Sequence, residues 1–86
     1  MRKKTRAFVY ILRCADGTLY TGYTIDLERR IQQHQSGRGA RYTRTRIPVE
    51  LVYSKSFRTR RAAMQREVEI KRYSRPRKMK LVQENS

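Results

Sequence analysis

Two sets of apolar side chains alternate over residues 8–14, and this is the clearest pattern in the chain. The two alternating sets are Phe8, Tyr10 and Leu12 on one side and Val9 and Ile11 on the other. A strand whose two faces are both apolar is covered on both sides. We therefore expect this segment to be a strand with other elements packed on each face, and residues 19–23 to return beside it.

The turn between these two segments is Ala15-Asp16-Gly17. A three-residue hairpin loop is usually a type I turn followed by one left-handed residue, and glycine is favoured there. The resulting register pairs Cys14 with Thr18, Leu12 with Tyr20, and Tyr10 with Gly22. The two phenols then lie on one face as diagonal neighbours. A two-residue Asp16-Gly17 loop would place them on opposite faces, and we prefer the loop that uses glycine where it is needed.

The remaining pattern predicts helices and a third strand. Thr24 is expected to cap a helix from Ile25 to about Ser36, which Gly37 would end. Residues 36–47 are expected to form a loop, followed by a strand. That strand is indicated by alternation of Val49, Leu51 and Tyr53.

Two more helices are expected towards the C-terminus. Thr59 would cap one that reaches about Tyr73, and Pro76 suits the first turn of a short third helix. The predicted fold is therefore α+β, with a three-stranded antiparallel sheet flanked by about three helices. We expect one domain over residues 1–86, with its core at about 7–82.

The chain carries 22 Lys and Arg against seven acids, a net charge of +15. Such an excess indicates a polyanionic partner, and nucleic acid is the commonest one in the cytoplasm. No apolar run is long enough to span a membrane, and the N-terminus lacks the pattern of a signal peptide. The single cysteine, Cys14, excludes an internal disulfide and suggests a reducing compartment. We expect a cytoplasmic monomer, with Cys14 more plausible as a buried strand residue than as a reactive thiol.

The first predicted helix has two polar residues on its apolar stripe. Leu27 and Ile31 define the stripe, and the helical repeat adds Arg30 and His34 to it. Arg29 should point away to solvent. Arg30 could instead lie along the edge of the stripe with its head in water, and a single histidine is often structural.

The second predicted helix offers two carboxylates, Glu67 and Glu69. Ala63, Glu67 and Ile70 follow a helical spacing that turns Glu67 toward a packed face. Glu69 lies nearer the arginines, although periodicity separates the two weakly. From the sequence alone, an ion-paired surface glutamate is the simpler interpretation of either residue.

These residues, taken in order, resemble the GIY-YIG nuclease family, and most closely its short single-domain bacterial members. Val9-Tyr10-Ile11 and Tyr20-Thr21-Gly22 stand where the family has its two tripeptides, and Arg30, His34 and the Gln65-Arg66-Glu67 segment follow in the family's order. The resemblance runs from about Ala7 to Val82. Both tripeptides depart from the family pattern, so the ordered set carries the match.

The resemblance implies an endonuclease that hydrolyses phosphodiester bonds with a divalent metal ion. It assigns the site to Tyr10, Tyr20, Arg30, His34 and Glu67. Glu67 would hold one Mg²⁺ or Mn²⁺ together with water and substrate phosphate. One phenol would act as the base, with Tyr10 favoured over Tyr20, and nearby cations would stabilise its phenolate.

Basic residues outside this set could bind the nucleic-acid backbone. The expected contacts are Arg38, Arg41, Tyr42, Arg44, Arg46, Lys71, Arg72 and Arg75. Tyr42 could stack on a base or could equally be a core plug beneath the loop. The nucleic acid is expected to be DNA, with RNA possible. The alternative functions are a non-catalytic nucleic-acid-binding module and a small ribosome-associated basic protein.

Overall fold

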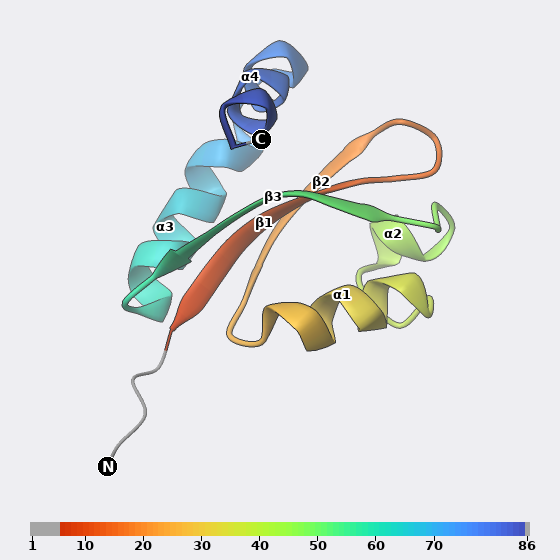
Figure 1. The fold of residues 1–86 in the computed structure, drawn as a ribbon, viewed down its shortest axis with the longest axis horizontal. Helices are drawn as coiled ribbons and strands as arrows, with labels where there is room; N and C mark the ends of the chain where they lie inside the picture. Colours follow the sequence, from red (N-terminus) through yellow and green to blue (C-terminus); the bar gives the residue numbers. More distant parts are fainter. Residues whose placement is uncertain (1–5, 86) are drawn as a thin grey trace.

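The computed structural model describes residues 6–85, which form three strands and four helices. The strands are β1 (Ala7–Arg13), β2 (Leu19–Thr24) and β3 (Glu50–Phe57). The helices are α1 (Leu27–Gln35), α2 (Arg41–Arg44), α3 (Arg60–Lys71) and α4 (Arg75–Asn85). The sheet order is β2-β1-β3 and both pairings are antiparallel. Figure 1 shows α1 and α2 on one side of this sheet and α3 and α4 on the other. The predicted α+β fold is confirmed.

The hairpin has the register predicted from its turn. Tyr10 pairs with Gly22 and Leu12 pairs with Tyr20. The Cys14 N–H donates to the Thr18 carbonyl at 2.8 Å, and Gly17 adopts a φ of 85°. Because only glycine enters this left-handed region without strain, the three-residue loop fixes which side chains share a face.

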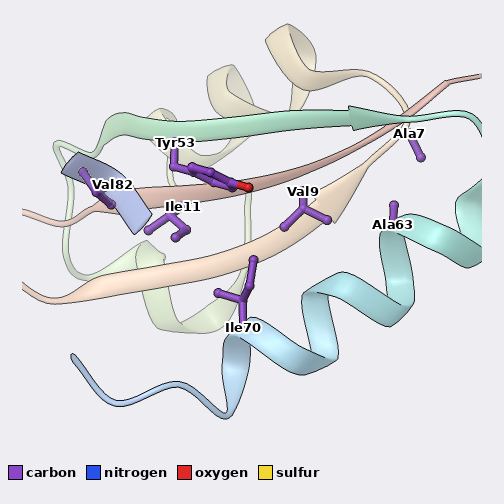
Figure 2. Packing of buried hydrophobic residues seen from close by; sticks show 7 residues of the cluster. All are labelled: Ala7, Val9, Ile11, Tyr53, Ala63, Ile70 and Val82. Carbon is purple, nitrogen blue, oxygen red and sulfur yellow. The ribbon is translucent and has the colours of Figure 1, made fainter. Parts of the chain in front are cut away.

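The larger apolar core lies between the sheet and the pair α3 and α4. It consists of Ala7, Val9, Ile11, Tyr53, Ala63, Ile70 and Val82. Figure 2 shows the odd-numbered side chains of β1 pointing toward Ala63 and Ile70 of α3. Burial of this apolar surface is the main stabilising contribution in a domain of this size.

The smaller apolar cluster lies on the opposite face of β1. It contains Tyr10, Leu12, Cys14 and Val49, with Tyr20, Leu27 and Ile31 packed against it. Helix α1 covers this face, and the Gln35 side-chain amide both donates to the Val49 carbonyl and accepts from its N–H. This clamp joins the end of α1 to the start of β3.

The prediction for the start of the first helix is wrong. The helix begins at Leu27, and its cap is Asp26, whose carboxylate accepts from the Arg29 N–H at 3.2 Å. Thr24 Oγ1 instead accepts from the Asp26 N–H at 3.1 Å. A carboxylate at a helix N-terminus satisfies a free donor and complements the helix dipole, which explains why Asp26 takes this position.

Two other local predictions are also corrected. Residues 41–44 in the expected loop form the short helix α2. The alternation of Val49, Leu51 and Tyr53 fails because the β1–β3 register shifts between Ile11 and Leu12, and Leu51 is 39% exposed. A bulge of this kind moves following residues to the other face. By contrast, the predicted cap of α3 is confirmed, since Thr59 Oγ1 accepts from the Ala62 N–H at 3.1 Å.

Cys14 is a buried strand-end residue, and burial raises the pKa of its thiol. A raised pKa keeps the thiol protonated and unreactive at neutral pH, which favours the structural interpretation.

Within residues 6–85, none of the helices is both long and apolar enough to cross a membrane. The cytoplasmic location and the monomeric state stay predictions.

Candidate active site

The two phenols of the hairpin lie together beneath α1. The ring centroids of Tyr10 and Tyr20 are 6.5 Å apart. His34 of α1 completes the group, with its ring centroid 5.7 Å from that of Tyr10 and 5.3 Å from that of Tyr20. The hairpin register and the helical stripe therefore bring these three rings into one cluster.

A chain of hydrogen bonds passes through the His34 ring. Its Nε2 atom lies 2.9 Å from the Tyr10 hydroxyl, and its Nδ1 atom lies 2.7 Å from Thr43 Oγ1 of α2. Thr43 and His34 are fully buried and Tyr10 is 1% exposed. Buried polar groups that each have a partner form a rigid network, so the imidazole is held on both sides.

Two glycines make room for this cluster. A Cβ at Gly22 would lie 2.6 Å from the Tyr10 oxygen, because the phenol lies directly over the backbone of its cross-strand partner. A Cβ at Gly39 would collide with the His34 ring. A side chain at either position would displace the Tyr10–His34 hydrogen bond.

The protonation states of the pair follow from burial. Burial, with a smaller contribution from the Arg30 charge, lowers the pKa of His34 to about 4. Burial raises the pKa of Tyr10 to about 12, although hydrogen bonding from Arg30 acts in the opposite direction. At neutral pH the pair is thus a phenol and a neutral imidazole. The expectation that nearby cations produce a Tyr10 phenolate is therefore wrong for the free protein, because burial outweighs the arginine.

Arg30 faces the cluster and also an open groove. Its Nη1 atom donates to Gln33 Oε1 at 2.9 Å, and its charge acts on both Tyr10 and His34. The groove beside it has a volume of about 370 Å³, and Gln33 of α1 and Arg60 of α3 also line it. Arg29, in contrast, is exposed. Arg30 thus connects the buried rings with a surface that a phosphate can reach.

The two glutamates of α3 lie in different environments. The Glu67 side chain is 17% exposed and pairs with Lys71 at 3.3 Å. Its negative charge contributes to the raised pKa of Tyr10. The Glu69 side chain is 61% exposed and pairs with Arg66 at 3.0 Å. Of the two carboxylates, Glu67 is therefore the one whose charge acts on the phenol cluster.

The available ligands suit a hard divalent cation that takes few of its ligands from the protein. Among the described residues, no group of three His, Cys, Asp or Glu could form a closed metal cage. Magnesium needs no such cage, because one or two carboxylates with waters and substrate phosphate suffice. The half-buried Glu67 carboxylate, within electrostatic range of Tyr10, fits that requirement.

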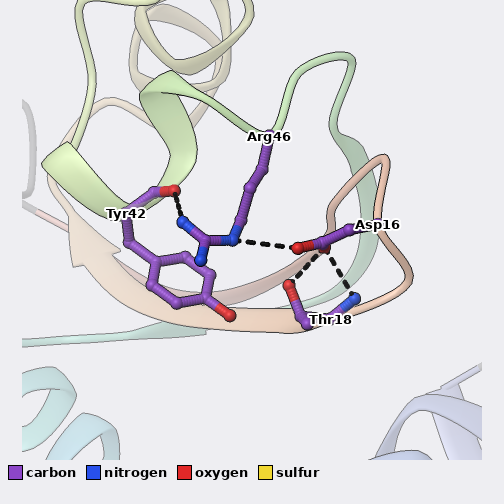
Figure 3. Close-up of polar contacts among 4 residues, drawn as sticks. All are labelled: Asp16, Thr18, Tyr42 and Arg46. Atoms are coloured by element: carbon purple, nitrogen blue, oxygen red, sulfur yellow. Dashed lines mark hydrogen bonds and ion pairs between the residues drawn. The ribbon is translucent and has the colours of Figure 1, made fainter.

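Tyr42 has a role that neither of the sequence interpretations described. Its ring stacks on Tyr20 with centroids 5.9 Å apart, and the Arg46 guanidinium lies 3.9 Å from its centroid. Figure 3 shows how Arg46 also donates to the Tyr42 carbonyl and to Asp16, while Asp16 accepts from Thr18. Tyr42 is 38% exposed, so it links α2 to the hairpin and is not a buried core residue beneath the loop.

The other basic residues predicted to bind nucleic acid are distributed over two regions. Arg38, Arg41 and Arg44 are exposed around α2, on the same side of the sheet as the three rings. Lys71 pairs with Glu67, whereas Arg72 and Arg75 are exposed at the junction of α3 and α4. The α2 residues are therefore the ones positioned beside the ring cluster.

Three residues of the site were missed in the sequence. Thr43 lies in a segment whose sequence resembles an arginine-rich loop. Gly39 lies against the His34 ring, where a side chain would not fit. Arg60 reaches the groove of Arg30 from a different helix. The spacing of Thr43 from His34 matches no repeat, so only the tertiary structure reveals these contacts.

Residues 6–80 match the GIY-YIG catalytic domain. A UPF0213 protein of Natronomonas pharaonis is 59% identical over 75 residues, which cover 87% of this chain and 88% of that protein. The solution structure of a UPF0213 protein from Bacillus halodurans superposes with a TM-score of 0.60 at 50% identity, covering 91% of this chain and 83% of that one. A solution structure of an Enterococcus faecalis protein gives a TM-score of 0.63 at 38% identity, covering 96% and 88%.

The chain belongs to the GIY-YIG family, as the ordered tripeptides, arginine and glutamate had indicated. Its relatives include short proteins of similar length that carry the name UPF0213. Membership places the chain in a family of nucleases that generally use divalent metal ions.

Proposed function

We propose that this protein is a divalent-metal-dependent endonuclease that hydrolyses phosphodiester bonds, with DNA favoured over RNA as substrate. The observation that carries the proposal is the buried hydrogen bond between the Tyr10 hydroxyl and a neutral His34 ring. A phenol whose pKa is about 12 is a poor base by itself. A phenol that passes its own proton to an adjacent imidazole, as it takes one from water, need not ionise beforehand, and the negative phosphate of a bound substrate would raise the low pKa of that imidazole.

The two tyrosines would then have different roles. Tyr10 would take the proton of the attacking water, and His34 Nε2 would receive the proton that Tyr10 gives up. Tyr20 is only partly buried and stacks on Tyr42, so it is suited to orienting water or phosphate. Tyr10 is chosen as the base because it is the phenol with a proton acceptor at hydrogen-bonding distance.

Arg30 and Glu67 would handle the phosphate. The Arg30 guanidinium is a permanent charge with forked donors, which matches the geometry of phosphate oxygens. Its position between the rings and the groove allows it to hold the scissile phosphate near Tyr10. Glu67 would hold a Mg²⁺ or Mn²⁺ ion, which when bound supplies positive charge to the phosphate oxygens.

The surface around α2 would guide the substrate to this site. Arg38, Arg41 and Arg44 are exposed there, and the net charge of +15 favours any polyanion. Lys71, Arg72 and Arg75 add positive charge beyond Glu67. Contacts of this kind neutralise phosphates without reading sequence, so they are compatible with either DNA or RNA.

A cleavage assay on a substrate panel tests this function. Single-stranded, duplex and branched DNA, and single-stranded and duplex RNA, would each be incubated with Mg²⁺, with Mn²⁺ or with EDTA. The proposal predicts metal-dependent cleavage of at least one DNA substrate, abolished by EDTA. Salt-dependent binding without cleavage of any substrate would instead favour the non-catalytic binding module, and selective binding of ribosomal RNA fragments without cleavage would favour the ribosome-associated protein.

A further inference from the structure

Thr43 is out of place in its surroundings. It belongs to the short helix α2, whose neighbouring residues Tyr42 and Arg44 are exposed, yet Thr43 itself is fully buried. A buried hydroxyl is costly unless it has hydrogen-bonding partners. Thr43 has two within hydrogen-bonding distance, since its Oγ1 lies 2.7 Å from His34 Nδ1 and 3.0 Å from the Ala40 carbonyl oxygen.

Two arrangements of protons are compatible with the positions of the heavy atoms. In the first, Thr43 donates to the Ala40 carbonyl and accepts the Nδ1 proton of His34, so that Nε2 accepts the Tyr10 proton. In the second, Thr43 donates to Nδ1 and the Nε2 proton points at the Tyr10 oxygen. The distances alone do not choose between them, but the count of donors and acceptors does.

The second arrangement leaves a proton without an acceptor. Tyr10 would then receive the Nε2 proton, and its own hydroxyl proton would need another acceptor, which the nearby Arg30 guanidinium, with donors only, does not supply. Within residues 6–85, the hydrogen-bonding acceptor that the structure offers to the Tyr10 hydroxyl proton is His34 Nε2. The first arrangement satisfies every group, and a buried network with an unpaired donor is unfavourable.

We propose that Thr43 is a positioning residue that fixes His34 as the Nδ1-protonated tautomer, which leaves Nε2 free to accept the proton of Tyr10. The consequence for catalysis rests on the proposed function, whereas the tautomer itself does not. A histidine whose second nitrogen is held by a hydrogen bond has its tautomer determined by that partner. The residue acts through His34 and makes no contact with substrate.

The surroundings hold Thr43 in place for this task. Gly39 lets the chain pass directly against the His34 ring. The Arg46 carbonyl accepts from the Ala15 N–H at 2.8 Å, and the Arg46 side chain pairs with Asp16 at 3.0 Å. Helix α2 is thus fastened to the hairpin turn, and the two consecutive residues Tyr42 and Thr43 contact Tyr20 and His34 respectively.

Nitrogen NMR of the histidine ring measures the tautomer directly. The chain contains one histidine, so its ring signals need no assignment against others. In the wild-type protein at pH 7, the proposal predicts a proton on Nδ1 and an unprotonated Nε2. A proton on Nε2, or an equal mixture of the two tautomers, overturns the proposal without any variant having to fold.

Substitutions then separate positioning from packing. Thr43→Val keeps the shape but removes the acceptor, so the Nδ1 proton is expected to move to Nε2 in a substantial fraction of molecules. Thr43→Ser keeps the hydroxyl and should retain the wild-type tautomer. Thr45→Val, at the exposed C-terminal end of α2, is the matched control and should change neither signal. An unchanged tautomer in folded Thr43→Val contradicts the proposal.

Cleavage kinetics provide the second readout. Thr43→Val is expected to lower kcat by about 10-fold to 100-fold with KM unchanged, because general-base catalysis is impaired and substrate binding is not. Thr43→Ser should recover most of this loss. If the wild-type tautomer is the expected one but no substrate is cleaved, the proposed function fails and the tautomer assignment stands. A changed tautomer with unchanged kcat overturns the catalytic part of the inference.

Discussion

The two faces of β1 are covered in different ways. The odd-numbered residues Val9 and Ile11 pack against Ile70 and other apolar groups of α3 and α4. On the even-numbered face, Tyr10 bonds to His34 and His34 bonds to Thr43. Apolar packing tolerates exchange of one side chain for another of similar volume, whereas a buried hydrogen bond fails when either partner is lost. One face therefore supplies stability, and the other holds a fixed arrangement of polar groups.

Glu67 joins the two faces. It belongs to α3, which packs on the apolar side, yet its charge acts on Tyr10 of the other side. Ala63 and Ile70 of the same helix are fully buried in the apolar core. Packing of α3 thus determines where the carboxylate lies, and the site depends on the core for its geometry.

The largest effect is expected from Glu67→Gln. Loss of the carboxylate should lower metal-dependent cleavage by about 100-fold to 1,000-fold, the scale for removing one electrostatic partner of a transition state. Binding of nucleic acid without metal should hold or tighten slightly, because a negative charge near the phosphates is removed. Single-turnover cleavage and fluorescence anisotropy measure the two quantities.

Glu69→Gln is the matched control for that prediction. Its carboxylate pairs with Arg66 at the surface, and exposed ion pairs contribute little. Cleavage by this variant should stay close to wild type. An equal loss in both variants would show that a carboxylate on α3 matters for folding or charge and not for the site.

Ile70→Ala tests the apolar face. Truncation of this fully buried side chain should lower the free energy of unfolding by about 2–5 kcal/mol. Chemical denaturation followed by circular dichroism measures the loss. Cleavage per folded molecule should change far less than in Glu67→Gln, and a loss per folded molecule as large as that of Glu67→Gln would contradict the division between the two faces.

Acid should destabilise the polar face through His34. The folded-state pKa of about 4 lies below the ordinary value of 6.5, so the unfolded chain binds the proton more readily. The stability that the neutral ring contributes is fully present above pH 6.5. It is lost as pH falls toward 4, which lowers the free energy of unfolding by up to about 3 kcal/mol. The charged and titratable groups facing the ring are Tyr10, Tyr20 and Arg30.

The pH window identifies the residue responsible. Hydrogen bonds from Thr18 lower the pKa of Asp16, so the stability that this ionised carboxylate contributes is lost only below about pH 4. Urea unfolding at steps from pH 7 to pH 4, for wild type and His34→Gln, separates the two. If the free energy of unfolding of His34→Gln falls with pH as steeply as that of wild type, His34 is not the source of the loss of stability.

The smallest effect is expected from Arg41→Ala, on the exposed surface of α2. Loss of one phosphate contact should weaken binding for every sequence and reduce the slope of log K against log salt by about one. Stability should stay nearly constant. Arg46→Ala is the contrast, because Arg46 fastens α2 to Asp16, and this change should affect stability and the orientation of Tyr20 more than the salt slope.

Local patterns were sufficient to predict the hairpin and the cap of α3. The register followed from Gly17 alone, since a left-handed residue fixes the loop type and the loop type fixes the pairing. The helical repeat placed Arg30 and His34 on one stripe, and the structure brings both to the phenols. These predictions depend on interactions between residues close in the sequence.

Contacts between distant segments could not be predicted in this way. The bulge at Ile11 and Leu12 reversed the face of Leu51, and no residue type marks it in the sequence. Thr43 contacts His34 because Gly39 allows close approach, and that requires the path of the whole loop. The sign of the Tyr10 pKa shift depended on burial, which composition does not reveal.

The most direct test compares Tyr10→Phe with Tyr53→Phe. Both tyrosines are buried and both lie in the sheet, but Tyr10 belongs to the polar cluster and Tyr53 to the apolar core. Cleavage rate and free energy of unfolding would be measured for each. Tyr10→Phe should lower cleavage by about 100-fold, the lower end of the range of general-base catalysis, while Tyr53→Phe should leave cleavage near wild type. Equal cleavage by the two variants would contradict the assignment of the chemistry to the Tyr10 face.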